Sequence, residues 1–145
     1  MKRAFIILAV TFSIGAALGV IGVELVNAHH PPIYRTEVLR TDLAGTAGKE
    51  VRLWVTEIYP GGATGKYYHP TPRFVYVLEG SVTLEVDGQL PRTFRAGDAF
   101  QERPDDVQKF KNASPNESAK ALAFQIAEKG QPLEQIQAPS PGKGL

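Results

Sequence analysis

The sequence predicts an all-β domain whose strands close into a small sandwich or barrel. Runs rich in β-branched and aromatic residues recur at residues 51–59, 73–79, 81–86, 93–95, 99–102, 109–111 and 120–127. Turn signals such as Asp87-Gly88 and Gly97-Asp98 separate several of these runs. No long helical pattern lies between them, and short strands at this spacing are typical of sandwiches and barrels.

The composition limits what the domain can do. A length of 145 residues is enough for one domain, and 16 basic against 15 acidic residues give a formal net charge of +1. This balance leaves no basic footprint for nucleic acid. Cysteine is absent, which excludes disulfides and thiolate chemistry, and three histidines leave little material for a histidine-rich metal site.

The first 28 residues predict an N-terminal helix outside the barrel. A basic start is followed by an uncharged apolar run over residues 4–23. Val26 and Ala28 place small residues where a signal peptidase would cut. Two interpretations stay open, a signal peptide that is removed and a retained membrane anchor, because about 20 apolar residues can span a bilayer. Both predict a periplasmic or extracellular domain, secreted or held at the outer face of the inner membrane.

The remaining chain divides into three further segments. Residues 29–48 are expected to form a spacer and an edge strand, and residues 49–129 the barrel. Residues 119–128 could form a helix by propensity, but the alternation of Leu122, Phe124 and Ile126 with smaller or polar residues favours a strand. From residue 130 to residue 145, proline, glycine, glutamine and serine predominate, which predicts a flexible tail.

Two glycine-framed motifs supply the candidate site. The first motif begins at Gly61 and ends at Gly80. Five residues separate Gly61 from Tyr67, His69 follows two positions after Tyr67, and Arg73 four positions after His69. Residues two and six apart on an extended chain share a face, so Tyr67, His69 and Arg73 are expected on one face if the chain stays extended. In the second motif Gly97 precedes four polar or charged motif positions, Arg103, Asp105, Gln108 and Asn112.

These motifs resemble those of the cupin superfamily, in particular its small single-domain members. The resemblance implies a jelly-roll barrel, or double-stranded β-helix, with the motif side chains facing inward. Cupin metal sites use three histidines and one glutamate, and the matching positions here carry Tyr67, His69, Arg73 and Gln108. Asp105 stands where the second motif has a glycine, and the final asparagine is present as Asn112.

This side-chain set predicts no tightly bound metal and no other cofactor. Arginine is always charged and has no lone pair to give, and tyrosine binds metals only as the phenolate. A divalent metal is therefore disfavoured, and the alternative is a relocated site made by His69, Glu102 and Gln108.

Arg73 allows two interpretations because an inward-facing guanidinium needs a partner. It could form an internal ion pair with Glu102, which is expected to face inward together with Phe100, or it could bind an anionic ligand. Trp54 is expected in the core or in the pocket wall. The predicted ligand-binding residues are Arg73, Glu102, Gln108 and Trp54.

The function expected from these observations is binding of a small organic molecule, with an anionic one suited to Arg73, by an exported barrel without a tightly held metal. One alternative is a metal-free isomerase, epimerase or lyase that uses His69 and Tyr67 as an acid–base pair. A second is a weak metal-dependent enzyme. A homodimer formed through an exposed sheet edge is also expected.

Overall fold

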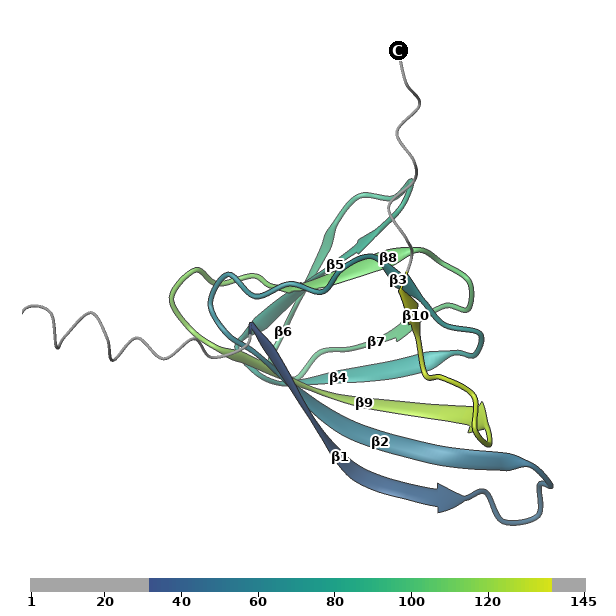
Figure 1. Cartoon of the computed structure of the whole chain (residues 1–145). Coiled ribbons are helices and arrows are strands. Elements are labelled where there is room, and N and C mark those ends of the chain that lie inside the picture. Colours follow the sequence, from purple (N-terminus) through teal and green to yellow (C-terminus); the bar gives the residue numbers. More distant parts are fainter. Residues whose placement is uncertain (1–31, 137–145) are drawn as a thin grey trace, which may run out of the picture. The chain divides into compact units, whose positions relative to one another are not determined.

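The computed structural model describes residues 32–136, which form an all-β fold with no helix (Figure 1). The strands are β1 (Ile33–Asp42), β2 (Lys49–Ile58), β3 (Tyr67–Tyr68), β4 (Arg73–Glu79), β5 (Ser81–Val86), β6 (Arg92–Arg95), β7 (Ala99–Glu102), β8 (Gln108–Asn112), β9 (Ala119–Glu128) and β10 (Gln135–Ile136). All seven strands predicted from the sequence are confirmed, as β2 and as β4 to β9.

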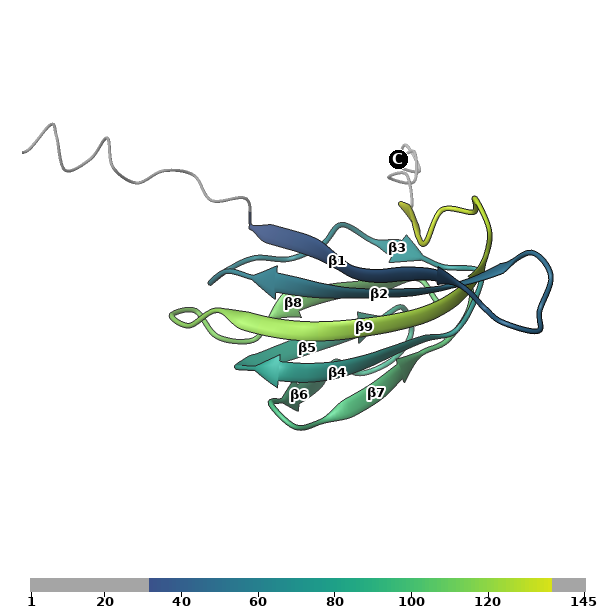
Figure 2. The ribbon, with the colours of Figure 1, turned by 90° about the horizontal axis from the view of Figure 1, so that it is seen from below.

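The strands form two antiparallel sheets of five strands each. The first has the order β1-β2-β9-β4-β7 and the second the order β10-β3-β8-β5-β6. Figure 2 shows the first sheet lying in front of the second. The chain changes sheet between consecutive strands except at β1–β2 and β5–β6, and the buried side chains of both sheets fill the space between them.

Aromatic side chains fill one part of this interior. Phe94 and Phe100 stack with ring centroids 4.0 Å apart, and Phe110 lies 6.2 Å from Phe100. Val75 and Val77 are buried on β4, as their alternation along the chain predicts. Burial of these apolar side chains is the main favourable term in the stability of the barrel.

Residues 119–128 form strand β9, as predicted, but the small residues of this strand are buried and its larger apolar residues lie on the outer face. Ala119, Ala121, Ala123 and Gln125 are buried, and the larger side chains of residues 122, 124 and 126 are only half-buried on the outer face. Because β9 is the central strand of the first sheet, alanines on its inner face leave room for the long polar side chains of neighbouring strands.

Both ends of the described chain pack against the barrel. The expected edge strand is β1, which pairs with β2 along its length, with a register shift between Glu37 and Leu39. At the other end the sequence predicts a flexible tail, and its residues as far as Ile136 fold back, with Leu133 packed against the core and β10 paired with β3.

The predicted N-terminal signal or anchor helix falls on residues 1–28 and lies outside the described residues. Between residues 32 and 136, no helix has the length and hydrophobicity needed to cross a membrane.

Candidate functional site

The first motif crosses from one sheet to the other. Tyr67 belongs to β3 in the second sheet, and Arg73 opens β4 in the first. The shared face of Tyr67, His69 and Arg73 was expected if the chain stays extended, and this condition is not met, since the chain leaves the strand conformation between residues 69 and 72. The three side chains still meet because both sheets turn their inner faces to the same interior, where all three are at least 97 % buried.

Strand register fixes two pairs of polar residues opposite each other. In the β3–β8 ladder Tyr67 lies opposite Gln108, and in the β4–β7 ladder Arg73 lies opposite Glu102. Directly opposite residues have their Cβ atoms about 4.5–5.5 Å apart, so their side chains interact. The two ladders thus place four polar groups in one buried region.

The second motif contributes a turn that supports His69. Asp105 is the single residue other than glycine with a positive φ in the described chain, at 62°. This is the left-handed conformation that favours glycine and that aspartate tolerates better than most residues. Its backbone N–H donates to the carbonyl of His69 at 3.0 Å, which ties the turn to the first motif.

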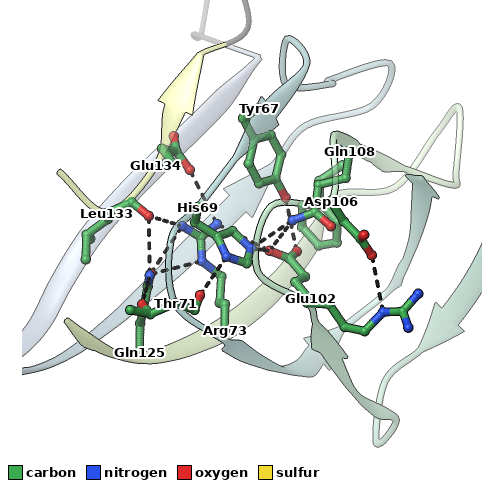
Figure 3. Close-up of polar contacts among 12 residues, drawn as sticks. Tyr67, His69, Thr71, Arg73, Glu102, Asp106, Gln108, Gln125, Leu133 and Glu134 are labelled. Atoms are coloured by element: carbon green, nitrogen blue, oxygen red, sulfur yellow. Dashed lines mark hydrogen bonds and ion pairs between the residues drawn. The ribbon is translucent and has the colours of Figure 1, made fainter. Parts of the chain in front are cut away.

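The centre of the site is the carboxylate of Glu102, which four side chains contact (Figure 3). It is 2 % exposed. The distances are 3.0 Å from Tyr67 Oη to Oε1, and 2.9 Å from Gln108 Nε2, 3.1 Å from His69 Nε2 and 3.4 Å from Arg73 Nη1 to Oε2. These four residues stand at the motif positions that carry metal ligands in cupins, and here they surround an anion.

Hydrogen bonds define the tautomer of His69. Its Nδ1 lies 2.7 Å from the carbonyl oxygen of Thr71, which can only accept, so Nδ1 carries a proton. The other ring nitrogen lies 2.9 Å from the Gln108 amide and 3.1 Å from Glu102. Neutral His69 therefore accepts from Gln108, and protonated His69 donates to Glu102. This histidine has a proton partner in either charge state.

Tyr67 is held as a neutral phenol. Burial, and after it the charge of Glu102, raises the pKa of the Tyr67 hydroxyl well above the ordinary value of 10.0, although the charge of Arg73 opposes the shift. The hydroxyl donates to Glu102. Tyr67 can therefore serve as a proton donor, and phenolate chemistry is disfavoured at neutral pH.

Arg73 is almost fully occupied by protein groups. Besides Glu102, its donors reach Glu134 Oε2 at 3.3 Å, the carbonyl of Leu133 at 3.2 Å and Gln125 Oε1 at 3.4 Å. Its guanidinium carbon also lies 4.9 Å from the centre of the Trp54 ring. A buried cation between two carboxylates and an aromatic face is well compensated. The internal ion pair with Glu102 is present, and an anion would have to displace one of these partners.

The donor set does not fit the divalent metal that the cupin fold implies. The Arg73 guanidinium points at the centre of the site, and Tyr67 is a protonated phenol. The remaining two positions supply one imidazole nitrogen and the Gln108 amide, whose Nε2 faces the centre as a donor. Among residues 32–136 no three His, Cys, Asp or Glu side chains are grouped so that they could share a metal ion.

A pocket of about 270 Å³ reaches Glu102 and Gln108 from outside. Leu84 and Phe100 form apolar walls, and the remaining lining residues are Val86, Gln89, Leu90, Arg92, Ala99, Gln101, Arg103 and Asp106. Gln108 is 1 % exposed and its Oε1 has no hydrogen-bond partner in the described protein. Such a buried unsatisfied acceptor calls for an explanation, and a ligand group is one.

The structure brings together the six residues that the sequence singled out. Tyr67, His69, Arg73 and Gln108 contact Glu102, and Trp54 stacks on Arg73. Sequence reasoning missed four further members of the network, Thr71, Gln125, Leu133 and Glu134. The sequence carried no signal for Gln125, because the alternation on β9 does not show which of its two faces points inward.

Comparisons with known proteins agree on the fold. Residues 54–124 match the family model described as Cupin domain. No curated protein matches the sequence. A cupin-like protein from Thermotoga maritima is similar with a TM-score of 0.55 and 19 % identity, over 68 % of this chain and 76 % of that one.

Two solved enzymes share the fold as well. The polyketide cyclase RemF from Streptomyces resistomycificus has a TM-score of 0.59 and 21 % identity, over 75 % of this chain and 74 % of that one. The DMSP lyase DddQ from Ruegeria pomeroyi has a TM-score of 0.60 and 13 % identity, and the match covers 75 % of this chain and 53 % of the lyase. At such identities the likeness establishes the fold alone. The domain match shows that the chain belongs to the cupin family, as a small cupin with a single barrel in its described residues, and the solved structures agree with it in fold.

Proposed function

We propose that this cupin binds a small organic molecule in the pocket above Glu102 and Gln108, without a tightly held metal. The observation that carries the proposal is the buried, unpaired Gln108 Oε1 in a residue that lines an open pocket. Leaving a buried acceptor unsatisfied costs about 1–3 kcal/mol, which a ligand hydrogen bond would recover. The pocket joins apolar walls such as Leu84 and Phe100 to seven polar or charged lining residues, which suits a small polar ligand.

The polar groups at the base of the pocket select a hydrogen-bond donor. Glu102 Oε1 accepts one bond, from Tyr67, and so retains accepting capacity, and Gln108 Oε1 is a free acceptor. A ligand hydroxyl or ammonium group satisfies both. An anionic group on the same ligand suits the outer lining, where Arg92 and Arg103 lie. A small hydroxy acid combines these two features.

Binding of a panel of probes tests this proposal. Glycerol, glycolate and acetate are titrated against the protein, and ligand-observed NMR reports binding. Glycolate should bind and acetate should bind more weakly, because acetate lacks the hydroxyl. The pocket-filling substitution Val86→Phe should abolish binding, whereas Val38→Phe on the exposed strand β1 should not. Equal binding to Val86→Phe and to the unmodified protein would remove the pocket from the proposal.

Metal analysis of purified protein tests the second half of the proposal. We expect substoichiometric transition metal, because Arg73 repels a cation and one imidazole is a weak site by itself. One equivalent of zinc, iron or manganese that survives dialysis would contradict it.

A second candidate function is favoured by one observation. Glu102 contacts both Tyr67 and His69 and also lines the pocket, so a ligand can reach a carboxylate with two proton partners. This arrangement suits a metal-free isomerase, epimerase or lyase that moves a proton on a sugar or an oxo acid. Incorporation of solvent deuterium into such a substrate, lost in His69→Gln, would support it, and exchange that persists in this variant would exclude His69 from the chemistry.

Export is part of the proposal and rests on residues 1–28 alone. Fractionation of cells that carry the full-length chain, with detection of the N-terminal residue by mass spectrometry, separates a cleaved signal peptide from a retained anchor. A full-length protein in the soluble cytoplasmic fraction would contradict both.

A further inference from the structure

The segment that follows β9 delivers a carboxylate to a second pocket. Residues 131–136 fold back and end in β10, a strand of two residues that pairs with β3. Glu134 on this segment forms an ion pair with Arg35 and a second one, at 3.3 Å, with Arg73. Two arginines from different strands therefore converge on one carboxylate that a short terminal pairing holds in place.

The surroundings of this carboxylate form a pocket of about 180 Å³. Arg35, Arg52 and Arg73 line it together with Glu37 and Glu134, and Trp54 provides an aromatic wall. Behind the pocket, Glu102 also pairs with Arg73 and Glu50 with Arg52. If Glu134 moves out, Arg35 loses a carboxylate partner and Arg73 keeps only Glu102. The pocket is separate from the one at Gln108, with which it shares no lining residue.

Arg73 could form shorter hydrogen bonds with a ligand carboxylate than those it forms with protein groups. Its guanidinium carbon lies 4.9 Å from the centre of the Trp54 ring, so an aromatic face covers one side of the cation. Its hydrogen bonds in the site are 3.2–3.4 Å long, whereas charge-assisted N–H···O bonds are about 2.7–2.9 Å when geometry is good. A free carboxylate can approach in the bidentate arrangement that a tethered glutamate does not reach here.

We propose that this pocket is a binding site for small carboxylates, preferably aromatic ones, and that Glu134 occupies it as an intramolecular competitor. A ligand carboxylate takes the place of the Glu134 carboxylate on Arg35 and Arg73, and the ligand's apolar part contacts Trp54. Binding then requires release of the segment 131–136. The apparent affinity is therefore the intrinsic affinity multiplied by the fraction of time that Glu134 is out of the site.

Trp54 gives a direct readout because it is the single tryptophan of the chain. Benzoate is titrated while the indole N–H signal is followed by heteronuclear NMR, with benzamide as the neutral isostere. Benzoate should shift the signal, and benzamide should not. In Glu134→Gln, which removes the competing charge, benzoate should bind at least about tenfold more tightly, the equivalent of about 1.4 kcal/mol.

The matched control is Glu37→Gln. Glu37 lines the same pocket and its loss changes the charge equally, but it pairs with Arg52 and is not a partner of Arg73. Its effect on benzoate binding should be clearly smaller than that of Glu134→Gln. Equal tightening in both variants, or none in Glu134→Gln, would overturn the competition.

The unmodified protein supplies a second test that does not depend on folding of a variant. Saturating benzoate should shift the backbone amide signals of Gln135 and Ile136, because β10 loses its pairing with β3 when Glu134 leaves. A Trp54 shift without any change at these two amides would overturn the displacement. The Val86→Phe variant should bind benzoate normally, which keeps this site distinguishable from the pocket at Gln108.

Discussion

Replacement of Glu102 by glutamine probes the centre of the site with almost no change of shape. In the structure four side chains direct hydrogen-bonding groups at this carboxylate, at 2.9–3.4 Å. Glutamine has one accepting oxygen, and its NH2 group would meet some of these donors head on. The substitution also removes one of the two carboxylates that compensate Arg73.

The structure allows an estimate of the loss. Breaking a buried ion pair by removing one partner costs about 3–5 kcal/mol. Glu134 continues to neutralise part of the Arg73 charge, which favours a loss in the lower half of this range. The donors that lose their acceptor add to the loss. We expect about 4 kcal/mol. For a domain of this size 1 kcal/mol corresponds to about 4 °C, so Tm should fall by about 16 °C.

Differential scanning calorimetry and urea unfolding measure this change. The matched control is Glu85→Gln, which removes a carboxylate paired with Lys111 at the surface of β5 and should leave Tm close to that of the unmodified protein. A Tm for Glu102→Gln within about 4 °C of the unmodified protein, or above it, would refute the reasoning. That result would mean that the negative charge of Glu102 contributes little to the stability of the fold.

Glu102→Ala extends the same test. The variant keeps three donors, from Tyr67, Gln108 and Arg73, and the His69 imidazole around an empty volume. Added formate should therefore bind there and stabilise the variant by about 2.7 kcal/mol at a concentration one hundred times its Kd, which raises Tm. Formamide and sodium chloride should have no such effect. A similar gain with formamide would show that the cavity takes any small solute and is not selective for an anion.

Three further predictions concern the frame of the site. Asn112→Ala should cost about 2–3 kcal/mol in urea unfolding, because the buried amide bridges two main-chain carbonyls at 2.7 and 2.9 Å; a loss below about 1 kcal/mol would contradict this role. Gly80→Ala should cost at least about 1–3 kcal/mol, since Gly80 has a φ of 68° and a Cβ would lie 2.7 Å from the Ser118 carbonyl; an unchanged midpoint would refute the strain. Because the pKa of Tyr67 is raised in the folded protein, its contribution to the free energy of unfolding is fully present below pH 10 and is lost as pH rises above 10. Tyr67→Phe should therefore lose less stability than the unmodified protein between pH 10 and higher pH; an equal loss in both proteins would contradict this.

The sequence predicted most of the fold because alternation and turn residues are local signals. Every predicted strand exists, and Gly80 makes the tight reversal between β4 and β5 that its position suggested. On β9 the alternation was correct as a strand signal, yet it did not reveal which parity faces inward. Which face of β9 points inward depends on the long side chains across the barrel, that is, on packing between segments that are distant in the sequence.

The network around Arg73 shows where local reasoning ends. The prediction of an inward-facing Arg73 next to Glu102 followed from motif spacing and parity, and the structure has both side chains in contact. Glu134 lies 61 residues further along the chain, in a segment whose composition indicates a tail. No periodic pattern links such a segment to a strand, so its contact with Arg73 and Arg35 could be found only from the folded chain.

The preserved spacing of the motifs has a structural cause that does not depend on a metal. Tyr67 and Gln108 are ladder partners, and so are Arg73 and Glu102, so the same spacing is needed to build the barrel whatever the side chains are. The spacing of the motifs is therefore evidence for the fold, whereas the identity of the side chains decides whether the centre of the site holds a cation or an anion. In this chain the motif positions point a phenol, an imidazole, an amide and a guanidinium at a carboxylate. A single change such as Tyr67→His would not restore a cation site, because Arg73 and its countercharge Glu102 would still occupy the centre.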